Sequence, residues 1–185
     1  MGEYLLETQG ISKSFSTVKV LEDINLKIRK GEIHALLGEN GAGKSTLMKI
    51  LTGVLAADKG TILYRGKPLK IVHPREIHEY GIGIVYQEFN LLPDLTVAEN
   101  IFIGREPQMS LKGFINDSKL NKEAAQLLER LNCSSISPTR KVGTLSVAEQ
   151  QMVEIAKALS SNCELLIMDE PTAALTDSEI DILFD

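Results

Sequence analysis

The eight residues Gly38–Ser45 constrain this chain most, because they read Gly-Glu-Asn-Gly-Ala-Gly-Lys-Ser, a complete GxxxxGKS pattern. The apolar run Ile33–Leu37 precedes them, and Thr46–Met48 continues them into a helical pattern. Glycines let successive amides turn towards a phosphate without a Cβ in the way, and a helix N-terminus adds a favourable dipole. The motif therefore predicts a nucleoside triphosphate site rather than a plain glycine turn. The residues expected to bind the nucleotide there are Gly38, Glu39, Asn40, Gly41, Ala42, Gly43, Lys44, Ser45 and Thr46.

Within this loop, Lys44 supplies a point charge for the phosphates and Ser45 offers a hydroxyl to Mg²⁺. A second set of oxygen ligands is expected where the apolar strand Leu165–Met168 ends in Asp169 and Glu170. Asp169 is predicted to hold the metal through its water shell. Glu170 is predicted to be the catalytic base that orients or deprotonates the attacking water. For an isolated Asp-Glu pair, two solvated acids at a turn before Pro171 would be the default interpretation, but the GKS loop upstream argues against it.

Apolar patterning predicts a chain that begins with strands. Ile24, Leu26 and Ile28 alternate with polar residues, whereas Ile33–Leu37 is a continuous apolar run typical of a strand buried on both faces. Further along the chain, the expected elements are a strand at Thr61–Tyr64, a helix at Pro74–Tyr80 ended by Gly81, a strand at Ile82–Tyr86 and a strand at Leu165–Met168.

Between the later strands the period changes to that of a helix. One expected apolar face comprises Ala124, Leu127, Leu128 and Leu131, and another comprises Met152, Ile155, Ala156 and Leu159. Ser/Thr-x-x-Glu capping boxes predict three helix starts, at Thr96 with Glu99, Ser146 with Glu149, and Thr176 with Glu179. A last helix opens near Asp177 and meets the chain end at Asp185, so the sequence is expected to be a fragment.

These patterns predict an α/β fold: a P-loop NTPase core with a mostly parallel sheet, an N-terminal antiparallel β part and a helical insertion. Residues 1–87 and 162–185 are expected to form the nucleotide-binding core, and residues 88–161 the insertion. At 185 residues with 43% apolar content, the chain is long enough for one substantial core.

Composition excludes several function classes. The longest apolar stretches fall far short of the roughly 20 residues that cross a bilayer, and the N-terminus lacks a signal pattern, so a soluble cytosolic protein is expected. Cys133 and Cys163 lie 30 positions apart and belong to no CxxC pattern or Cys/His cluster, which argues against a zinc site or a disulfide framework. The net charge of −5 argues against a general nucleic-acid binder.

With this phosphate loop and this acidic strand end, the sequence resembles the ATP-binding cassette (ABC) family along nearly the whole chain. The resemblance implies that Phe15 stacks on adenine and that Val20 completes this apolar contact, although Phe15 could also be an ordinary core residue. It also implies that Gln87, after the strand Ile82–Tyr86, contacts Mg²⁺ and senses a transmembrane partner.

Leu145–Gln151 looks like the family signature, usually LSGGQ, which closes over ATP bound by a second cassette. Its residues predicted to face that opposite site are Ser146, Val147, Ala148 and Glu149. Val147 and Ala148 replace glycines, which limits how closely the backbone can approach a γ-phosphate, and Glu149 replaces glutamine. The capping box preserves the local fold, because Gln or Glu can occupy its third helical position. The loop Pro171–Thr176 resembles the one that couples two opposed sites.

The stretches Gln87–Pro93, Leu95–Ile101 and Gly104–Pro107 resemble the N-terminal cassette of bacterial ribose, galactose and xylose importer ATPases. The resemblance implies a second cassette in the C-terminal half of one polypeptide, a membrane permease, and indirectly an external sugar-binding protein. It places the protein peripherally on the cytoplasmic face of the inner membrane. The family's switch histidine would lie beyond the last helix, and His34, His73 and His78 do not replace it.

Two other readings compete with a sugar importer. A soluble, non-transport cassette ATPase acting on ribosomes or DNA would share every phosphate-site residue, but the acidity and the importer-like stretch after Gln87 weigh against it. A regulatory half that binds ATP with little hydrolysis is kept open by the altered signature. Lys44 and Glu170 oppose that reading, because this cassette retains its own half of the machinery.

Overall fold

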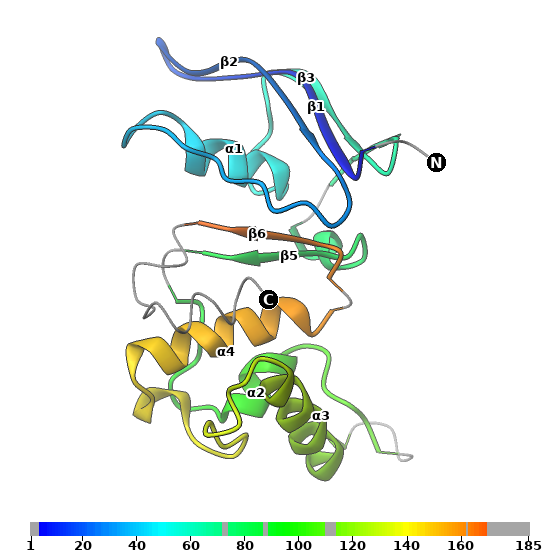
Figure 1. The fold of residues 1–185 in the computed structure, drawn as a ribbon, viewed down its shortest axis with the longest axis vertical. Helices are drawn as coiled ribbons and strands as arrows, with labels where there is room; N and C mark the ends of the chain where they lie inside the picture. Colours follow the sequence, from blue (N-terminus) through cyan, green and yellow to red (C-terminus); the bar gives the residue numbers. More distant parts are fainter. Residues whose placement is uncertain (1–3, 72–73, 87–88, 110–113, 162, 170–185) are drawn as a thin grey trace. The chain divides into compact units, whose positions relative to one another are not determined.

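The computed structural model describes residues 4–71, 74–86, 89–109, 114–161 and 163–169 (Figure 1). The chain divides into two compact units, one up to Ile82 and one from Gly83 onwards.

The first unit is built on a four-stranded sheet in the order β2-β1-β3-β4, with every neighbouring pair antiparallel. This sheet confirms the expected N-terminal antiparallel part and the strand at Thr61–Tyr64. Along β2, Ile24, Leu26 and Ile28 are half-buried and alternate with exposed residues, as the sequence predicts. The strands are β1 (Leu6–Phe15), β2 (Val18–Ile28), β3 (Lys59–Tyr64) and β4 (Lys67–Pro68).

Helix α1 (Lys44–Leu51) contacts β2 of this sheet and buries Leu47, Ile50 and Leu51 (Figure 1). The helix predicted at Pro74–Tyr80 is shorter in the structure and is a 3₁₀ helix, η1 (Pro74–His78). Gly81 nevertheless ends this segment as expected: its φ is 71°, and its N–H donates to the His78 carbonyl at 3.1 Å.

The run Ile33–Leu37 differs from the sequence prediction, which was wrong for this structure. It forms no strand and lies exposed, with Leu37 89% accessible. An apolar run becomes a doubly buried strand only where neighbours offer backbone partners and a sheet to join. In the described part of the first unit, the four strands already pair with one another, and none pairs with this run.

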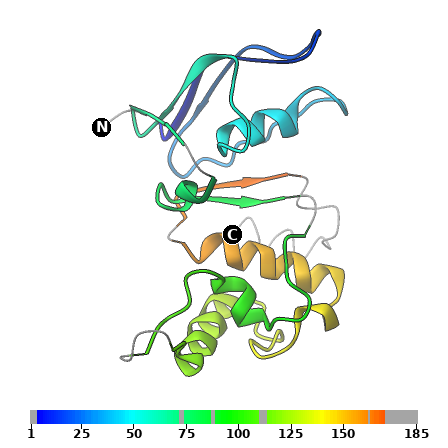
Figure 2. The same cartoon turned by 180° about the vertical axis from the view of Figure 1, so that it is seen from behind.

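The described residues of the second unit form a two-stranded sheet and three α-helices. Helix α4 lies between this sheet and the pair α2 and α3 in both views (Figures 1 and 2). The strands confirm the expected positions near Ile82 and Leu165. The elements are β5 (Ile82–Val85), β6 (Leu165–Met168), α2 (Val97–Phe102), α3 (Asp117–Arg130), α4 (Val147–Leu159) and the 3₁₀ helix η2 (Val142–Thr144).

Among the described residues of this unit, an apolar cluster joins Val85 of β5 to α2, α3 and α4. The two apolar faces predicted from helical spacing are confirmed. Ala124, Leu127, Leu128 and Leu131 are buried on the first face, and Met152, Ile155 and Ala156 are buried on the second. Leu159 of the second face is half-buried and packs against the same cluster. Among the residues that the structure describes, every helix is too short or too polar to cross a bilayer.

Candidate functional site

The phosphate loop ends at α1, and its backbone makes a tight entry into that helix. Gly43 is the N-cap with φ 92°, and Gly41 has φ 85°, a left-handed region that glycine adopts without strain. The Gly43 carbonyl accepts from the Leu47 N–H at 2.9 Å, and the Glu39 carbonyl accepts from the Ala42 N–H at 3.1 Å. The first turn of α1 carries no acidic residue, so no side-chain carboxylate there offsets the helix dipole.

Lys44 lies over the loop that precedes it. Its Nζ donates to the carbonyl of Gly38 at 2.7 Å and to that of Glu39 at 3.0 Å. The Lys44 side chain, from the end of the loop, therefore binds two carbonyls at its start. A Cβ built on Gly41 would meet nothing within 4 Å, which shows open space beside this part of the loop. A cationic side chain, left-handed glycines and a helix N-terminus are the features that suit a phosphate group.

Gly43 packs so closely against β2 that there is no room for a side chain at this position. A Cβ there would lie 2.7 Å from the Leu21 Cδ2 and 2.9 Å from the Val20 carbonyl oxygen. The end of the phosphate loop therefore packs directly against β2. Val20, predicted as an apolar nucleotide contact, is brought beside the loop by this packing.

Phe15 ends β1 with 47% of its surface exposed. The Lys13 ammonium lies 5.8 Å from the centre of its ring. Phe15 is therefore not the ordinary core residue that the sequence left open as an alternative. The predicted stacking of Phe15 on adenine stays a prediction.

The acidic strand end is described only up to Asp169. This residue follows β6, and its N–H donates to the Val85 carbonyl at 3.0 Å, which aligns it with the end of β5. Glu170, Gln87, the loop Pro171–Thr176 and the third capping box lie outside the described residues. The predicted metal and catalytic roles of Asp169, Glu170 and Gln87 therefore stay predictions.

The signature segment begins α4 with the predicted capping box. The Ser146 hydroxyl accepts from the Glu149 N–H at 3.2 Å, and the Glu149 carboxylate accepts from the Ser146 N–H at 2.7 Å. Arg140 adds an ion pair to Glu149 at 2.9 Å. The Ser146 backbone N–H is the first cause of the lowered pKa of Glu149. Val147 is 57% exposed at this helix start.

The same device begins α2, where Thr96 and Glu99 also form the predicted capping box. The Glu99 carboxylate accepts from the Thr96 N–H and from the Thr96 hydroxyl, each at 2.7 Å. The backbone bond is the first cause of the lowered pKa of Glu99.

One buried acid was missed by the sequence analysis. Glu154 lies on α4 with only 5% of its surface exposed, and this burial raises the pKa of its carboxyl. The available signal was a carboxylate in a helix whose flanking residues, Val153 and Ile155, are apolar. Spacing alone does not separate a buried acid from a solvated one.

Comparison with known proteins gives consistent matches. A family model described as "ABC transporter" matches residues 21–173. The ribose import ATP-binding protein of Halalkalibacterium halodurans is 51% identical over 97% of this chain and 36% of its own length. The chain thus spans about a third of the length of the curated relatives it matches.

Solved structures show the same fold. A nucleotide-free ATP-binding cassette from an ABC transporter superposes with a TM-score of 0.83 at 32% identity, covering 97% of this chain and 74% of that one. A dimeric, post-hydrolysis ATP-binding cassette bound to ADP and Pi gives a TM-score of 0.80 at 26% identity, covering 96% and 79%.

Proposed function

Because this chain belongs to the ABC transporter family, we propose that it binds and hydrolyses ATP to drive the uptake of a sugar, a monosaccharide, through a membrane permease. The observation that carries the proposal is the phosphate loop before α1, with Lys44 folded over it and Gly43 packed on β2. The relative named as a ribose import protein supports the sugar class.

In this proposal, residues 1–87 and 162–185 form the nucleotide-binding core and residues 88–161 the helical insertion. The hydroxyl of Ser45, the second residue of α1, would hold Mg²⁺ together with Gln87 and Asp169, and Asp169 would act through water. When bound, Mg²⁺ neutralises charge on the β- and γ-phosphates. Lys44 binds the phosphates and the loop amides orient them. Glu170 orients or deprotonates the attacking water for in-line attack on the γ-phosphate.

The partners belong to the same proposal. A second cassette, in the C-terminal half of the same polypeptide, would receive Ser146–Glu149 against its own nucleotide, and the dimeric solved cassette supports such pairing. The insertion would contact the permease on the cytoplasmic face of the membrane, and an external sugar-binding protein would act indirectly. The exposed Val147 at the start of α4 favours weak hydrolysis at the partner site, because a branched side chain limits backbone approach there.

Calorimetry with ATP, with and without Mg²⁺, tests the central claim. Lys44→Ala should weaken binding at least about 10-fold, because it removes a charge-assisted contact to phosphate. Lys49→Ala is the matched control, since Lys49 is an exposed lysine on the same helix. Absence of ATP binding by the folded native chain, or equal losses in the two variants, would contradict the proposal.

A further inference from the structure

One aspartate holds the strand end that carries Phe15. Asp58 lies in the loop between α1 and β3, and its N–H donates to the Ser12 carbonyl at 2.9 Å. Its carboxylate accepts from the Ser14 N–H at 2.7 Å and from the Lys13 ammonium at 2.6 Å. Asp58 therefore binds all three residues that precede Phe15 in β1.

These bonds support β1 beyond the point where β3 stops. The pairing of β1 with β3 ends at Ser12, opposite Lys59, and beyond it β2 is the remaining neighbour of β1 among the described strands. A backbone N–H at a strand end needs an acceptor. The Asp58 carboxylate supplies one to Ser14, where the next residue of a longer β3 would offer a carbonyl. The end of β1 is thus fixed on both of its edges.

Lys13 makes a second contact, with the ring of Phe15. Alternate residues of a strand share one side of the sheet, which brings these two side chains together. The Lys13 ammonium lies 5.8 Å from the ring centre, and its ion pair with Asp58 keeps it there. A cation over the face of an aromatic ring is attracted by the ring quadrupole. Lys13 is half-buried whereas Phe15 is exposed, so the ring rests on a fixed cation and keeps surface open for a flat group.

The strand pair that carries Phe15 also supports the phosphate loop. Phe15 pairs with Val18 across the turn between β1 and β2. Two residues further along β2, the Val20 carbonyl oxygen would lie 2.9 Å from a Cβ on Gly43, at the end of the loop. One hairpin therefore carries both the aromatic ring and the surface on which the loop packs.

Resting on the proposed function, we infer that Lys13 and Asp58 are positioning residues that hold Phe15 in place for a nucleobase. They act on the base through the Phe15 ring, whereas Lys44 acts on the phosphates. The pair of Lys13 and Asp58 therefore sets how strongly the chain prefers a nucleotide to a bare triphosphate.

Calorimetry on the full 185-residue chain with ATP and with inorganic tripolyphosphate, both in the presence of Mg²⁺, tests this inference. Lys13→Met removes the cation but keeps a long flexible side chain, and it should weaken ATP binding about 5-fold. Its tripolyphosphate affinity should stay unchanged, because that ligand has no base. Lys13→Arg keeps a cation that can contact both the carboxylate and the ring, and it should restore most of the ATP affinity.

Asp58→Asn tests the other member of the pair. The new amide keeps an oxygen that can accept from the Ser14 N–H, but it removes the charge that holds the Lys13 ammonium. This variant should also weaken ATP binding and leave tripolyphosphate binding unchanged.

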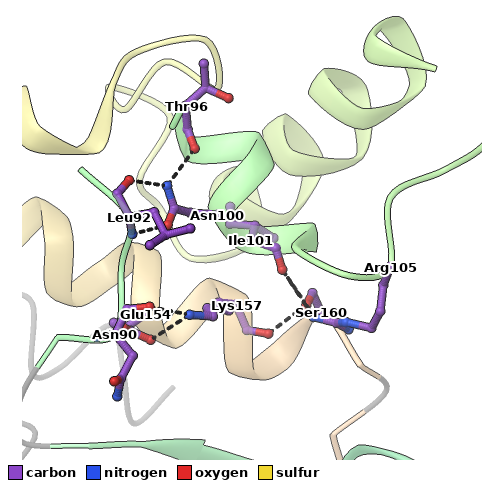
Figure 3. Close-up of polar contacts among 9 residues, drawn as sticks. All are labelled: Asn90, Leu92, Thr96, Asn100, Ile101, Arg105, Glu154, Lys157 and Ser160. Carbon is purple, nitrogen blue, oxygen red and sulfur yellow. Dashed lines mark hydrogen bonds and ion pairs between the residues drawn. The ribbon is translucent and has the colours of Figure 1, made fainter. Parts of the chain in front are cut away.

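Lys157→Met is the matched control, because Lys157 is another half-buried lysine with an acidic partner. It belongs to the second unit, where its ammonium lies 3.8 Å from the Glu154 carboxylate and donates to the Asn90 carbonyl at 2.8 Å (Figure 3). Loss of this lysine should leave the affinities for ATP and for tripolyphosphate unchanged.

A double-mutant cycle shows whether Lys13 acts through the ring. Phe15→Ala should weaken ATP binding at least as much as Lys13→Met does, again without loss of tripolyphosphate affinity. In the Phe15→Ala background, Lys13→Met should cost no further ATP affinity, because the ring that it positions is gone. A lysine that only stabilised the hairpin, or that contacted phosphate directly, would still show its own loss in that background.

Three results would overturn the inference: equal weakening of ATP and tripolyphosphate binding by Lys13→Met, no effect on either ligand, or independent losses in the double variant. Should Lys13→Met fail to fold, Asp58→Asn decides the matter by the same comparison of ligands. Undiminished ATP binding by Phe15→Ala would overturn it as well, while leaving the ATPase proposal intact. A folded native chain that binds neither ligand would instead refute the proposed function, and the inference with it.

Discussion

Replacing Gly43 by alanine tests the close packing of the phosphate loop on β2. Two costs add at this position. A non-glycine residue at φ 92° is strained by about 1–2 kcal/mol. The new Cβ would also lie 2.9 Å from the Val20 carbonyl oxygen and 2.7 Å from the Leu21 Cδ2. Overpacking of this kind costs about 1–3 kcal/mol, because a strand backbone cannot move away as a side-chain tip can.

The expected loss of unfolding free energy is therefore about 2–5 kcal/mol. Gly31→Ala is the control, because Gly31 has φ 74° but a Cβ there would meet nothing within 4 Å. It should cost only the strain, about 1–2 kcal/mol. Urea denaturation followed by circular dichroism measures both, with a slope of roughly 1–3 kcal/mol per molar urea. The extra packing cost of about 1–3 kcal/mol, at a slope of about 2 kcal/mol per molar, should lower the midpoint of Gly43→Ala by about 0.5–1.5 M more than that of Gly31→Ala.

Calorimetry with ATP completes this comparison, since Gly43→Ala should weaken binding and Gly31→Ala, outside the loop, should not. Equal urea midpoints for the two alanine variants would refute the packing argument and leave only backbone strain. An unchanged ATP affinity in Gly43→Ala would show that nucleotide binding does not depend on the packing of the loop at Gly43.

Three further outcomes are expected. Ser146→Ala should destabilise the protein by about 1 kcal/mol through loss of the α4 cap, measured by urea denaturation, and an unshifted midpoint would contradict the cap. The folded pKa of Glu99 lies below its ordinary value of 4.5, so its contribution to stability is present above pH 4.5 and is lost as pH falls through the folded pKa. Glu99→Gln should flatten the acid limb of the stability profile, and an unchanged limb would contradict this cause. Glu170→Gln in the full-length protein should bind ATP yet hydrolyse it at least about 100-fold more slowly, and near-wild-type turnover would remove Glu170 from the mechanism.

The sequence by itself determined the features that depend on residues close together in the chain. The glycines and Lys44 of the phosphate loop, the capping boxes at Thr96 and Ser146, and the apolar faces of α3 and α4 all follow from local spacing. Local geometry suffices for these features, because a cap or a helical face involves partners within one or two turns.

Tertiary structure decided what depends on partners far along the chain. Ile33–Leu37 has the composition of a buried strand, yet it lies exposed because strand formation requires backbone partners that composition does not supply. Glu154 reads in the sequence as one more helix acid, and only the fold brings it to the backbone of Asn90, 64 positions away. The burial of a charge is set by its spatial neighbours, so no local pattern in the sequence specifies it.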